Sequence, residues 1–207
     1  MRESANRSLR IAKFTMDAYA NYGNVLQNYA LQQILLRYAD RVDTLWTQPY
    51  NFMPEVWWNW RWKEYIKWLI NWKNFRTKIA NGHIGREMAR QVKIRDFSNR
   101  YISYHRVALE ALSDRIKHYD YCVVGSDQVW NPHFGNYHQF FLGFSPEEKR
   151  LSYAASISTM DIPAEEHDFF VQGLKGMKAL SVREQAGANL IEQLTGRKAE
   201  VHLDPTL

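Results

Sequence analysis

An apolar run that ends in a polar turn, at residues 119–132, constrains the fold of this chain more than any other segment. The run from Tyr121 to Val124 is apolar throughout, so a strand at this position needs burial on both faces. This pattern is typical of a central strand in a parallel sheet and not of an alternating edge strand. Gly125 then breaks the run and permits a tight turn. The segment therefore predicts a buried strand at the centre of an α/β domain.

Polar side chains follow this strand directly. Ser126, Asp127, Gln128 and Asn131 come within a few residues of its end, with Trp130 among them. In open parallel sheets, ligands bind at the carboxyl ends of the strands, which favours a binding site here. The same residue types are also common in turns, so an ordinary turn is the alternative interpretation.

The amino-terminal part predicts the opening of such a domain. Residues 9–15 have a strand pattern, and an apolar helical stripe extends from about residue 25 to 38. Between them, Asn21, Gly23 and Asn24 indicate a turn, with Asn24 well placed as the helix N-cap. The helix N-terminus offers N–H groups to an anion or a sugar hydroxyl. Alternatively, both asparagines serve only the turn and the cap. Only one glycine is present there, so a dinucleotide-binding fingerprint is not expected.

Strand and helix patterns alternate along the rest of the chain, which favours a doubly wound α/β fold. Further strands are expected at residues 41–46, 150–156 and 179–184, and another begins at residue 200. Helices are expected at about 85–105, 108–118, 163–175 and 185–194, and Gly196 is expected to cap the last of these.

A segment rich in tryptophan and basic residues interrupts this order. Twelve Lys and Arg against three acidic residues give residues 56–106 a net charge of +9, which leaves −4 for the rest of the +5 chain. Trp58, Trp62 and Trp72 share one helical face, which favours an amphipathic helix packed on the core. A helix on an anionic membrane surface is the second interpretation, and a nucleic-acid surface the third. Trp57, Trp60 and Trp68 lie off this face, and core packing does not account for them.

Composition excludes several classes of protein. The single cysteine, Cys122, has no partner within the chain for a disulfide, so a reducing, cytoplasmic compartment is expected. Neither a signal peptide nor an apolar run of 18 residues is present, so no membrane span is expected. His133 and His138 are five residues apart, but no cysteine or close carboxylate pair completes a set of ligands, so no metal site is expected.

The order and spacing of several motifs together resemble the polysaccharide pyruvyl transferase family. These motifs span nearly the whole chain: residues 21–27, NYGNVLQ; 123–131, VVGSDQVWN; 152–156, SYAAS; 180–184, LSVRE; and 203–207, LDPTL. Members of the family are similar to two-domain glycosyltransferases of the B type. The resemblance implies that residues 1–207 form a single Rossmann-like N-terminal domain, with a helical aromatic and basic insertion at about 52–106. The C-terminal domain of the family is expected to be absent from this chain.

The resemblance also implies a reaction. Enzymes of this family move the enolpyruvyl carbons of phosphoenolpyruvate onto two hydroxyls of a sugar as a cyclic ketal, during synthesis of cell-surface polysaccharides. No cofactor is expected beyond this donor substrate. The acceptor is a saccharide that is often lipid-linked, so we expect a peripheral location on the inner face of the membrane, with contact through Trp57, Trp60 and Trp68. No nucleic-acid partner is expected.

The resemblance suggests roles for individual residues. Arg183 is the candidate clamp for the phosphate and carboxylate of the donor, because a planar guanidinium matches both groups, and an ion pair with Glu184 is the alternative. Asp127 is the candidate base or ligand of the acceptor hydroxyl, and an Asx-turn is the alternative. The candidate substrate-binding residues are Asn21, Gly23, Asn24, Gln27, Gly125, Ser126, Gln128, Trp130, Asn131, Ser156 and Glu184.

Two other functions fit the same residues. One is a glycosyltransferase of the same architecture that uses a nucleotide sugar. The other is a non-catalytic module that binds saccharides. Protection of the protein by nucleotides and not by phosphoenolpyruvate would favour the first of these, and saccharide binding without turnover would favour the second.

Overall fold

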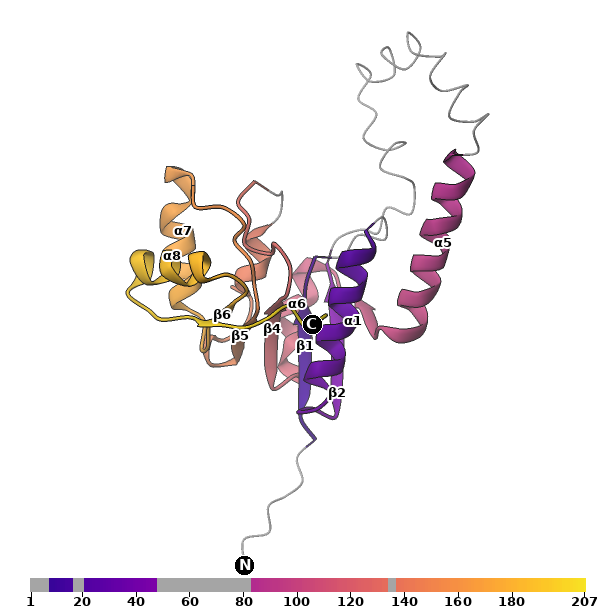
Figure 1. The fold of residues 1–207 in the computed structure, drawn as a ribbon. Coiled ribbons are helices and arrows are strands. Elements are labelled where there is room, and N and C mark those ends of the chain that lie inside the picture. Colours follow the sequence, from indigo (N-terminus) through magenta and orange to yellow (C-terminus); the bar gives the residue numbers. More distant parts are fainter. Residues whose placement is uncertain (1–7, 17–20, 48–82, 134–136) are drawn as a thin grey trace, which may run out of the picture.

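A computed structural model describes residues 8–16, 21–47, 83–133 and 137–207 of the protein (Figure 1). The helices of these described residues are α1 (Tyr22–Leu35), α5 (His83–Tyr101), α6 (Leu112–Arg115), α7 (His167–Lys175) and α8 (Gln185–Thr195). The strands are β1 (Arg10–Phe14), β2 (Arg41–Trp46), β3 (Tyr104–Arg106), β4 (Tyr121–Gly125), β5 (Arg150–Tyr153), β6 (Ser181–Val182) and β7 (Glu200–Val201). Short 3₁₀ turns are η1 (Leu109–Ala111), η2 (Ile116–His118), η3 (Tyr137–Phe141), η4 (Glu147–Lys149) and η5 (Ala164–Glu166).

The strands form a parallel, doubly wound arrangement. A five-stranded sheet has the order β3-β2-β1-β4-β5, and β6 and β7 form a second parallel pair. Parallel bridges between Leu151 and Ala179 and between Ala155 and Val182 connect this pair to β5. The chain therefore builds the sheet outward from β1 in one direction and then returns to continue it from β4 in the other. Ligands of such folds bind near this switch point, at the carboxyl ends of the strands.

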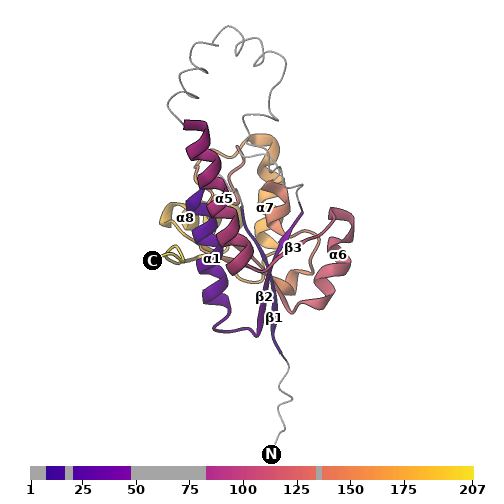
Figure 2. The ribbon, with the colours of Figure 1, turned by 90° about the vertical axis from the view of Figure 1, so that its right-hand side faces the viewer.

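Helices cover both faces of the sheet. Figure 2 shows α1 and α5 on one side of the strands and α6 on the other, and in Figure 1 α7 and α8 lie beside β6. One buried cluster joins β1, β2 and β4 to α1 and includes Ile11, Leu31 and Val123. A larger cluster on the opposite face joins Cys122 and Val124 to residues of α6, α7 and α8. The prediction of an α/β sheet flanked by helices is confirmed.

Strand β4 confirms the prediction of a strand buried on both faces. Because side chains alternate along a strand, Val123 packs under α1 while Cys122 and Val124 pack in the opposite cluster. All three side chains are 2% exposed or less. Burial raises the pKa of the Cys122 thiol, which fits its predicted role as a small core residue.

Helix α1 begins earlier than the sequence predicts. Asn21, and not Asn24, is its N-cap, because the Asn21 side chain accepts a hydrogen bond from the Gly23 N–H at 2.9 Å. The expected turn at residues 21–24 is therefore the cap and first turn of the helix. Asn24 lies inside that first turn.

The segment from residue 83 to 118 differs most from its prediction. The expected helix to His105 ends at Tyr101, and His105 lies in β3, the edge strand of the five-stranded sheet. The predicted insertion at about 52–106 thus contains part of the sheet. The helix expected at 108–118 is a succession of η1, the four-residue α6 and η2.

The remaining elements follow their predictions with shorter strands. The strand at 41–46 is confirmed residue for residue, whereas β5 ends at Tyr153 and β6 has only two residues. The helix expected from residue 163 begins with η5 and continues as α7. Gly196 ends α8 in the left-handed conformation, at φ 72°, as predicted. The predicted tryptophan-rich helix lies outside the described residues. Within the described part of the chain, no helix is long and apolar enough to cross a membrane.

Candidate functional site

The turn after β4 lies at the carboxyl edge of the sheet, beside the switch point. Gly125, the last residue of β4, has φ 129°, a conformation that residues with a side chain rarely adopt. A Cβ atom at this position would lie 2.0 Å from the Tyr153 carbonyl oxygen of the neighbouring strand. Only glycine therefore fits between β4 and β5 here, and its role is to shape the backbone.

Two buried polar atoms in this turn lack partners among the described residues. They are the Ser126 hydroxyl oxygen and Oδ2 of Asp127. Ser126 is fully buried and Asp127 is half-buried. The other carboxylate oxygen of Asp127 accepts a hydrogen bond from the Gln128 N–H at 2.8 Å. Buried polar groups are normally paired, so this pair of atoms is available to a ligand or an ordered water.

The environment of Asp127 favours its protonated form. Burial raises the pKa of this carboxyl, and the nearby charge of Asp204 raises it further. The Gln128 N–H and the charge of Arg183 oppose the shift without cancelling it. A carboxyl group with a raised pKa exchanges protons closer to neutral pH than an exposed aspartate does.

Arg183 follows β6 and is held by two carboxylates. Its Nε donates to Oε1 of Glu184 at 2.8 Å, and its Nη1 donates to Oδ2 of Asp204 at 3.2 Å. Gln27 of α1 also donates to Asp204. The ion pair between Arg183 and Glu184, the alternative interpretation from the sequence, is therefore present together with a second partner.

This cluster brings together residues that are far apart in the sequence. Asp127 follows β4, Arg183 and Glu184 follow β6, and Asp204 follows β7, while Gln27 comes from the first half of α1. We call them the edge cluster. Three carboxylates surround one guanidinium, so the edge cluster carries a net negative charge when its acids are ionised. A negative cluster with an amide suits the hydroxyls of a neutral sugar better than the phosphate of a donor.

Asp204 is the member of the edge cluster that the sequence does not indicate as a site residue. In the sequence it stands out only as part of the motif at residues 203–207. Its carboxylate accepts from Gln27, Arg183 and the backbone and side chain of Thr206, and these hydrogen bonds outweigh burial and lower its pKa. Because Gln27 and Asp204 are 177 residues apart, no local pattern indicates this contact.

Trp130 is not available to a substrate, which corrects its prediction as a binding residue. The side chain is 0% exposed, stacks on Phe141 with ring centres 5.5 Å apart, and donates its indole N–H to the Phe140 carbonyl at 3.1 Å. All its hydrogen-bonding capacity is therefore used within the core. Trp130 fixes the loop that carries Asp127, since its backbone N–H also bonds to the Ser156 carbonyl.

Some of the remaining predicted substrate-binding residues have buried side chains that bond within the loop, and the others lie nearer the surface. Ser156 is fully buried with its hydroxyl 2.8 Å from that of Ser158, and Asn131 is buried with its amide bonded to Gln128 and the His133 N–H. These two side chains serve the loop structure. Gln128 is half-buried beside Asp127. Asn21, Gly23 and Asn24 lie at the start of α1, on the same edge of the sheet, and Asn21 uses its side-chain oxygen as the cap.

Metal ligands do not gather in the described part of the chain. No group of three or more His, Cys, Asp or Glu residues is placed there to hold an ion. His138 instead lies 2.9 Å from Glu166.

Comparison with known protein families gives a match that covers most of the chain. A model of the polysaccharide pyruvyl transferase family matches residues 21–207, from the cap of α1 through Asp204. The chain belongs to this family. The match covers every member of the edge cluster, and the family indicates a transferase. No curated protein and no solved structure gives a significant match.

Proposed function

We propose that this polysaccharide pyruvyl transferase family member transfers pyruvyl from phosphoenolpyruvate to two hydroxyls of a sugar as a cyclic ketal, in the synthesis of a cell-surface polysaccharide. The observation that supports this role best is the half-buried Asp127 carboxyl, with an unpartnered oxygen, inside the edge cluster. Its position at the carboxyl ends of the strands is the usual ligand site of this fold.

The reaction sets clear chemical requirements. A proton is added to the methylene carbon of phosphoenolpyruvate, which becomes a methyl group, and the first sugar hydroxyl attacks the cationic carbon beside it. Phosphate then leaves, and the second hydroxyl attacks the same carbon to close the ring. The two hydroxyls release two protons: one balances the proton gained by the methyl group, and the other leaves with the phosphate.

Asp127 has the properties that the proton transfers require. Its raised pKa allows it to hold a proton at a higher pH than an exposed aspartate does, and its Oδ2 has no partner among the described residues. We assign it a proton-transfer role at the acceptor hydroxyl, with the Ser126 hydroxyl as a neighbouring hydrogen-bonding group. A carboxyl that is held in this way contributes about 10²–10⁴ in rate in enzymes that use general acid–base catalysis.

The edge cluster supports binding of the acceptor more than binding of the donor. Arg183 was the candidate clamp for the donor phosphate, but Glu184 and Asp204 occupy its fork. A highly charged anion would have to displace both carboxylates to reach it. We therefore assign Arg183 to positioning of Asp204 and Glu184, whose oxygens, with Gln27, bind sugar hydroxyls. In this proposal the donor phosphate is held by other residues.

The test measures release of inorganic phosphate from phosphoenolpyruvate by the full chain in the presence of saccharide and lipid-linked saccharide acceptors. With an accepted sugar, we expect Asp127→Asn to lower the rate by about 10² or more. Asp161→Asn changes an exposed aspartate outside the edge cluster and serves as the matched control. Equal rates for the two variants would contradict the role of Asp127.

A second measurement addresses the donor. Phosphoenolpyruvate at about a hundred times its dissociation constant should add roughly 2.7 kcal/mol to the stability of a protein that binds it. Since Arg183 is assigned to positioning, the thermal shift should persist in Arg183→Ala. A shift with nucleotides and none with phosphoenolpyruvate would contradict the proposed donor and favour a nucleotide-sugar glycosyltransferase.

A further inference from the structure

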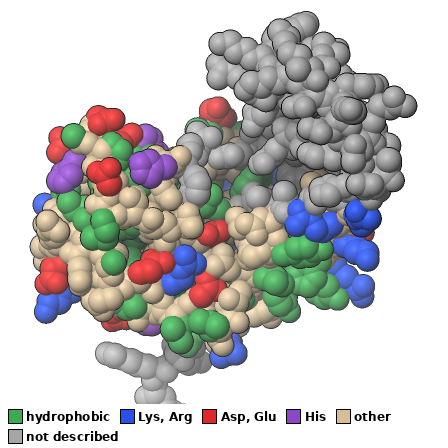
Figure 3. All heavy atoms as spheres, turned by 45° about the horizontal axis from the view of Figure 1, so that its top comes forward, with side chains coloured by type: hydrophobic (Ala, Val, Ile, Leu, Met, Phe, Trp, Pro, Cys, Tyr) green, Lys and Arg blue, Asp and Glu red, His purple; other side chains and the backbone are tan. Residues whose placement is uncertain are grey.

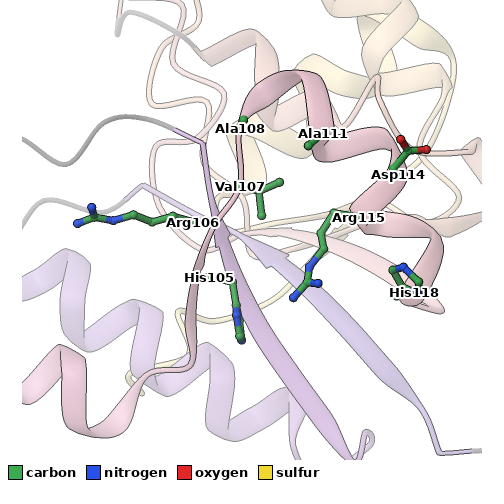
Figure 4. Close-up of a pocket in the computed structure, with 8 residues that line it drawn as sticks. All are labelled: His105, Arg106, Val107, Ala108, Ala111, Asp114, Arg115 and His118. Carbon is green, nitrogen blue, oxygen red and sulfur yellow. The ribbon is translucent and has the colours of Figure 1, made fainter.

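A groove of about 500 Å³ lies under the edge strand β3, away from the edge cluster (Figure 4). One wall is β3 and the segment that follows it, and the other is η1, α6 and η2. Its volume is within the range of small-ligand sites, about 300–1,000 Å³. The lining residues are His105, Arg106, Val107, Ala108, Ala111, Asp114, Arg115 and His118.

Basic side chains face into this groove. In Figure 4 the His105 and Arg115 side chains extend toward the same space, and the guanidinium lies between the His105 and His118 rings. The Arg106 side chain and the Asp114 carboxylate point away from it. The groove therefore presents one permanent cation flanked by two imidazoles.

The buried carboxylate beneath these groups is already paired. Asp43 is 1% exposed and accepts hydrogen bonds from Arg41 at 2.6 Å, from the Ser103 hydroxyl at 2.8 Å and from the Tyr119 hydroxyl at 2.8 Å. It also lies 3.2 Å from Nε2 of His105. Arg41 already neutralises the charge of Asp43. The positive charge of Arg115 is therefore not balanced by this carboxylate.

Arg115 has unused hydrogen-bonding capacity. Its Nε is buried and has no hydrogen-bond partner among the described residues. An unpaired buried donor is costly, and an oxyanion in the groove would supply the missing acceptor. A planar guanidinium binds phosphate oxygens in pairs, and histidine N–H groups donate to the remaining oxygens.

We propose that this groove is a binding site for a phosphate group, formed by Arg115 with His105 and His118. The site is separate from the edge cluster. Five strand spacings separate β3 from β6, roughly 24 Å at about 4.8 Å each, so an ion at Arg115 does not contact Arg183. The inference does not depend on the proposed transferase reaction.

Calorimetric titration of the full chain with inorganic pyrophosphate tests the site. We expect saturable binding that Arg115→Gln weakens about tenfold or more, because hydrogen bonds to charged groups contribute at this level. Arg37→Gln, at an exposed arginine after α1, should leave the affinity unchanged. Arg183→Ala should also leave it unchanged. The melting temperature of Arg115→Gln without ligand should be no lower than that of the wild type, because the substitution removes a buried N–H that has no acceptor among the described residues.

Clear outcomes would overturn the proposal. Absence of saturable pyrophosphate binding in the millimolar range would do so, as would equal affinities for wild type and Arg115→Gln. Loss of binding in Arg183→Ala, with Arg115→Gln unaffected, would place the anion at the edge cluster instead. His118→Gln provides a second variant at the other side of the groove, and an unchanged affinity in both groove variants excludes the site.

A soluble phosphorylated ligand and a lipid phosphate headgroup share the chemistry of this groove. Flotation with vesicles that contain phosphatidic acid separates these sources. For a lipid headgroup, Arg115→Gln reduces flotation and pyrophosphate competes with the vesicles. For a soluble ligand, pyrophosphate binds while flotation is the same in both proteins.

Discussion

At the scale of single residues, the turn after β4 combines a backbone constraint with an unusual carboxyl group. Gly125 leaves no room for a side chain beside Tyr153, and this close approach places Asp127 at the sheet edge. Burial then raises the pKa of Asp127. The same turn thus positions the carboxyl group to which we assign proton transfer and raises its pKa, which lowers the stability of the fold when the group is ionised.

That cost predicts a pH-dependent effect of Asp127→Asn. Below the ordinary carboxyl pKa of 3.8, Asp127 is protonated in the folded and unfolded chain, so its shift has no effect on stability. As the pH rises from there through the raised folded pKa, the unfolded chain releases its proton first and stability falls. At pH values above the folded pKa, the free energy of unfolding is lowered by about 1.4 kcal/mol for every tenfold difference between the acid dissociation constants of Asp127 in the unfolded and folded chain. We expect Asp127→Asn to be more stable than wild type at pH 7, with the difference disappearing toward pH 3.8 in urea denaturation.

A second prediction concerns the glycine. Gly125→Ala should lower the free energy of unfolding by roughly 4 kcal/mol or prevent folding, because its Cβ would meet the Tyr153 carbonyl and φ is positive. Gly143→Ala is the matched control, since no atom lies within 4 Å of its Cβ position. Equal stability of both variants in chemical denaturation would show that the backbone does not need glycine at 125.

At the scale of elements, helix α1 shows how capping sets a boundary. Asn21 bonds the free N–H of Gly23, whereas Asn24 already lies within the helix. Both asparagines suit a cap in the sequence, and the backbone conformation decides between them. The earlier start places the N-terminus of α1 and Gln27 against the carboxyl-terminal segment of the domain, through Asp204.

Substitution of each asparagine measures this choice. Asn21→Ala should destabilise the protein by about 1 kcal/mol through loss of the cap. Asn24→Ala should be nearly neutral or slightly stabilising, because alanine is the better helix former inside the first turn. Thermal denaturation of the two variants in parallel checks the assignment. A larger loss in Asn24→Ala would restore Asn24 as the cap.

At the scale of the whole molecule, basic side chains gather beside one end of the fold. Figure 3 shows Lys and Arg side chains beside the grey segment, over α5, and acidic and His side chains over α7 on the opposite side. The exposed residues of α5 include Arg86, Lys93 and Arg100. The basic charge that the sequence assigns to residues 56–106 thus continues onto a described helix.

This polarity supports a test of the predicted membrane contact. Trp57, Trp60 and Trp68 lie outside the described residues, so their role stays a prediction from the sequence. We expect the protein to float with anionic liposomes, less so at high salt, and substitution of the three tryptophans by alanine to reduce flotation. Neutral liposomes are the control. No flotation, or flotation unaffected by the substitutions, would contradict the membrane contact.

The sequence by itself determined the class of fold, the central strand and the turn after it. These features depend on local patterns: the apolar run at 121–124, the glycine that ends it, and the alternation of strand and helix periods. The family motifs are equally readable, because they are short and ordered along the chain. Helix ends and short edge strands are harder to predict from the sequence. Strand β3, for example, has only three residues, too few to show the alternation of apolar and polar side chains that indicates a strand.

Only the tertiary structure decided which polar residues act together. Trp130 and Asp127 share one motif, yet packing against Phe141 buries the first and leaves the second at the sheet edge. The contact between Gln27 and Asp204, and the two carboxylates on Arg183, depend on which strand ends become neighbours. Strand order is a long-range property of the folded chain. Local sequence therefore specifies the elements, while their packing specifies the charge and accessibility of the site.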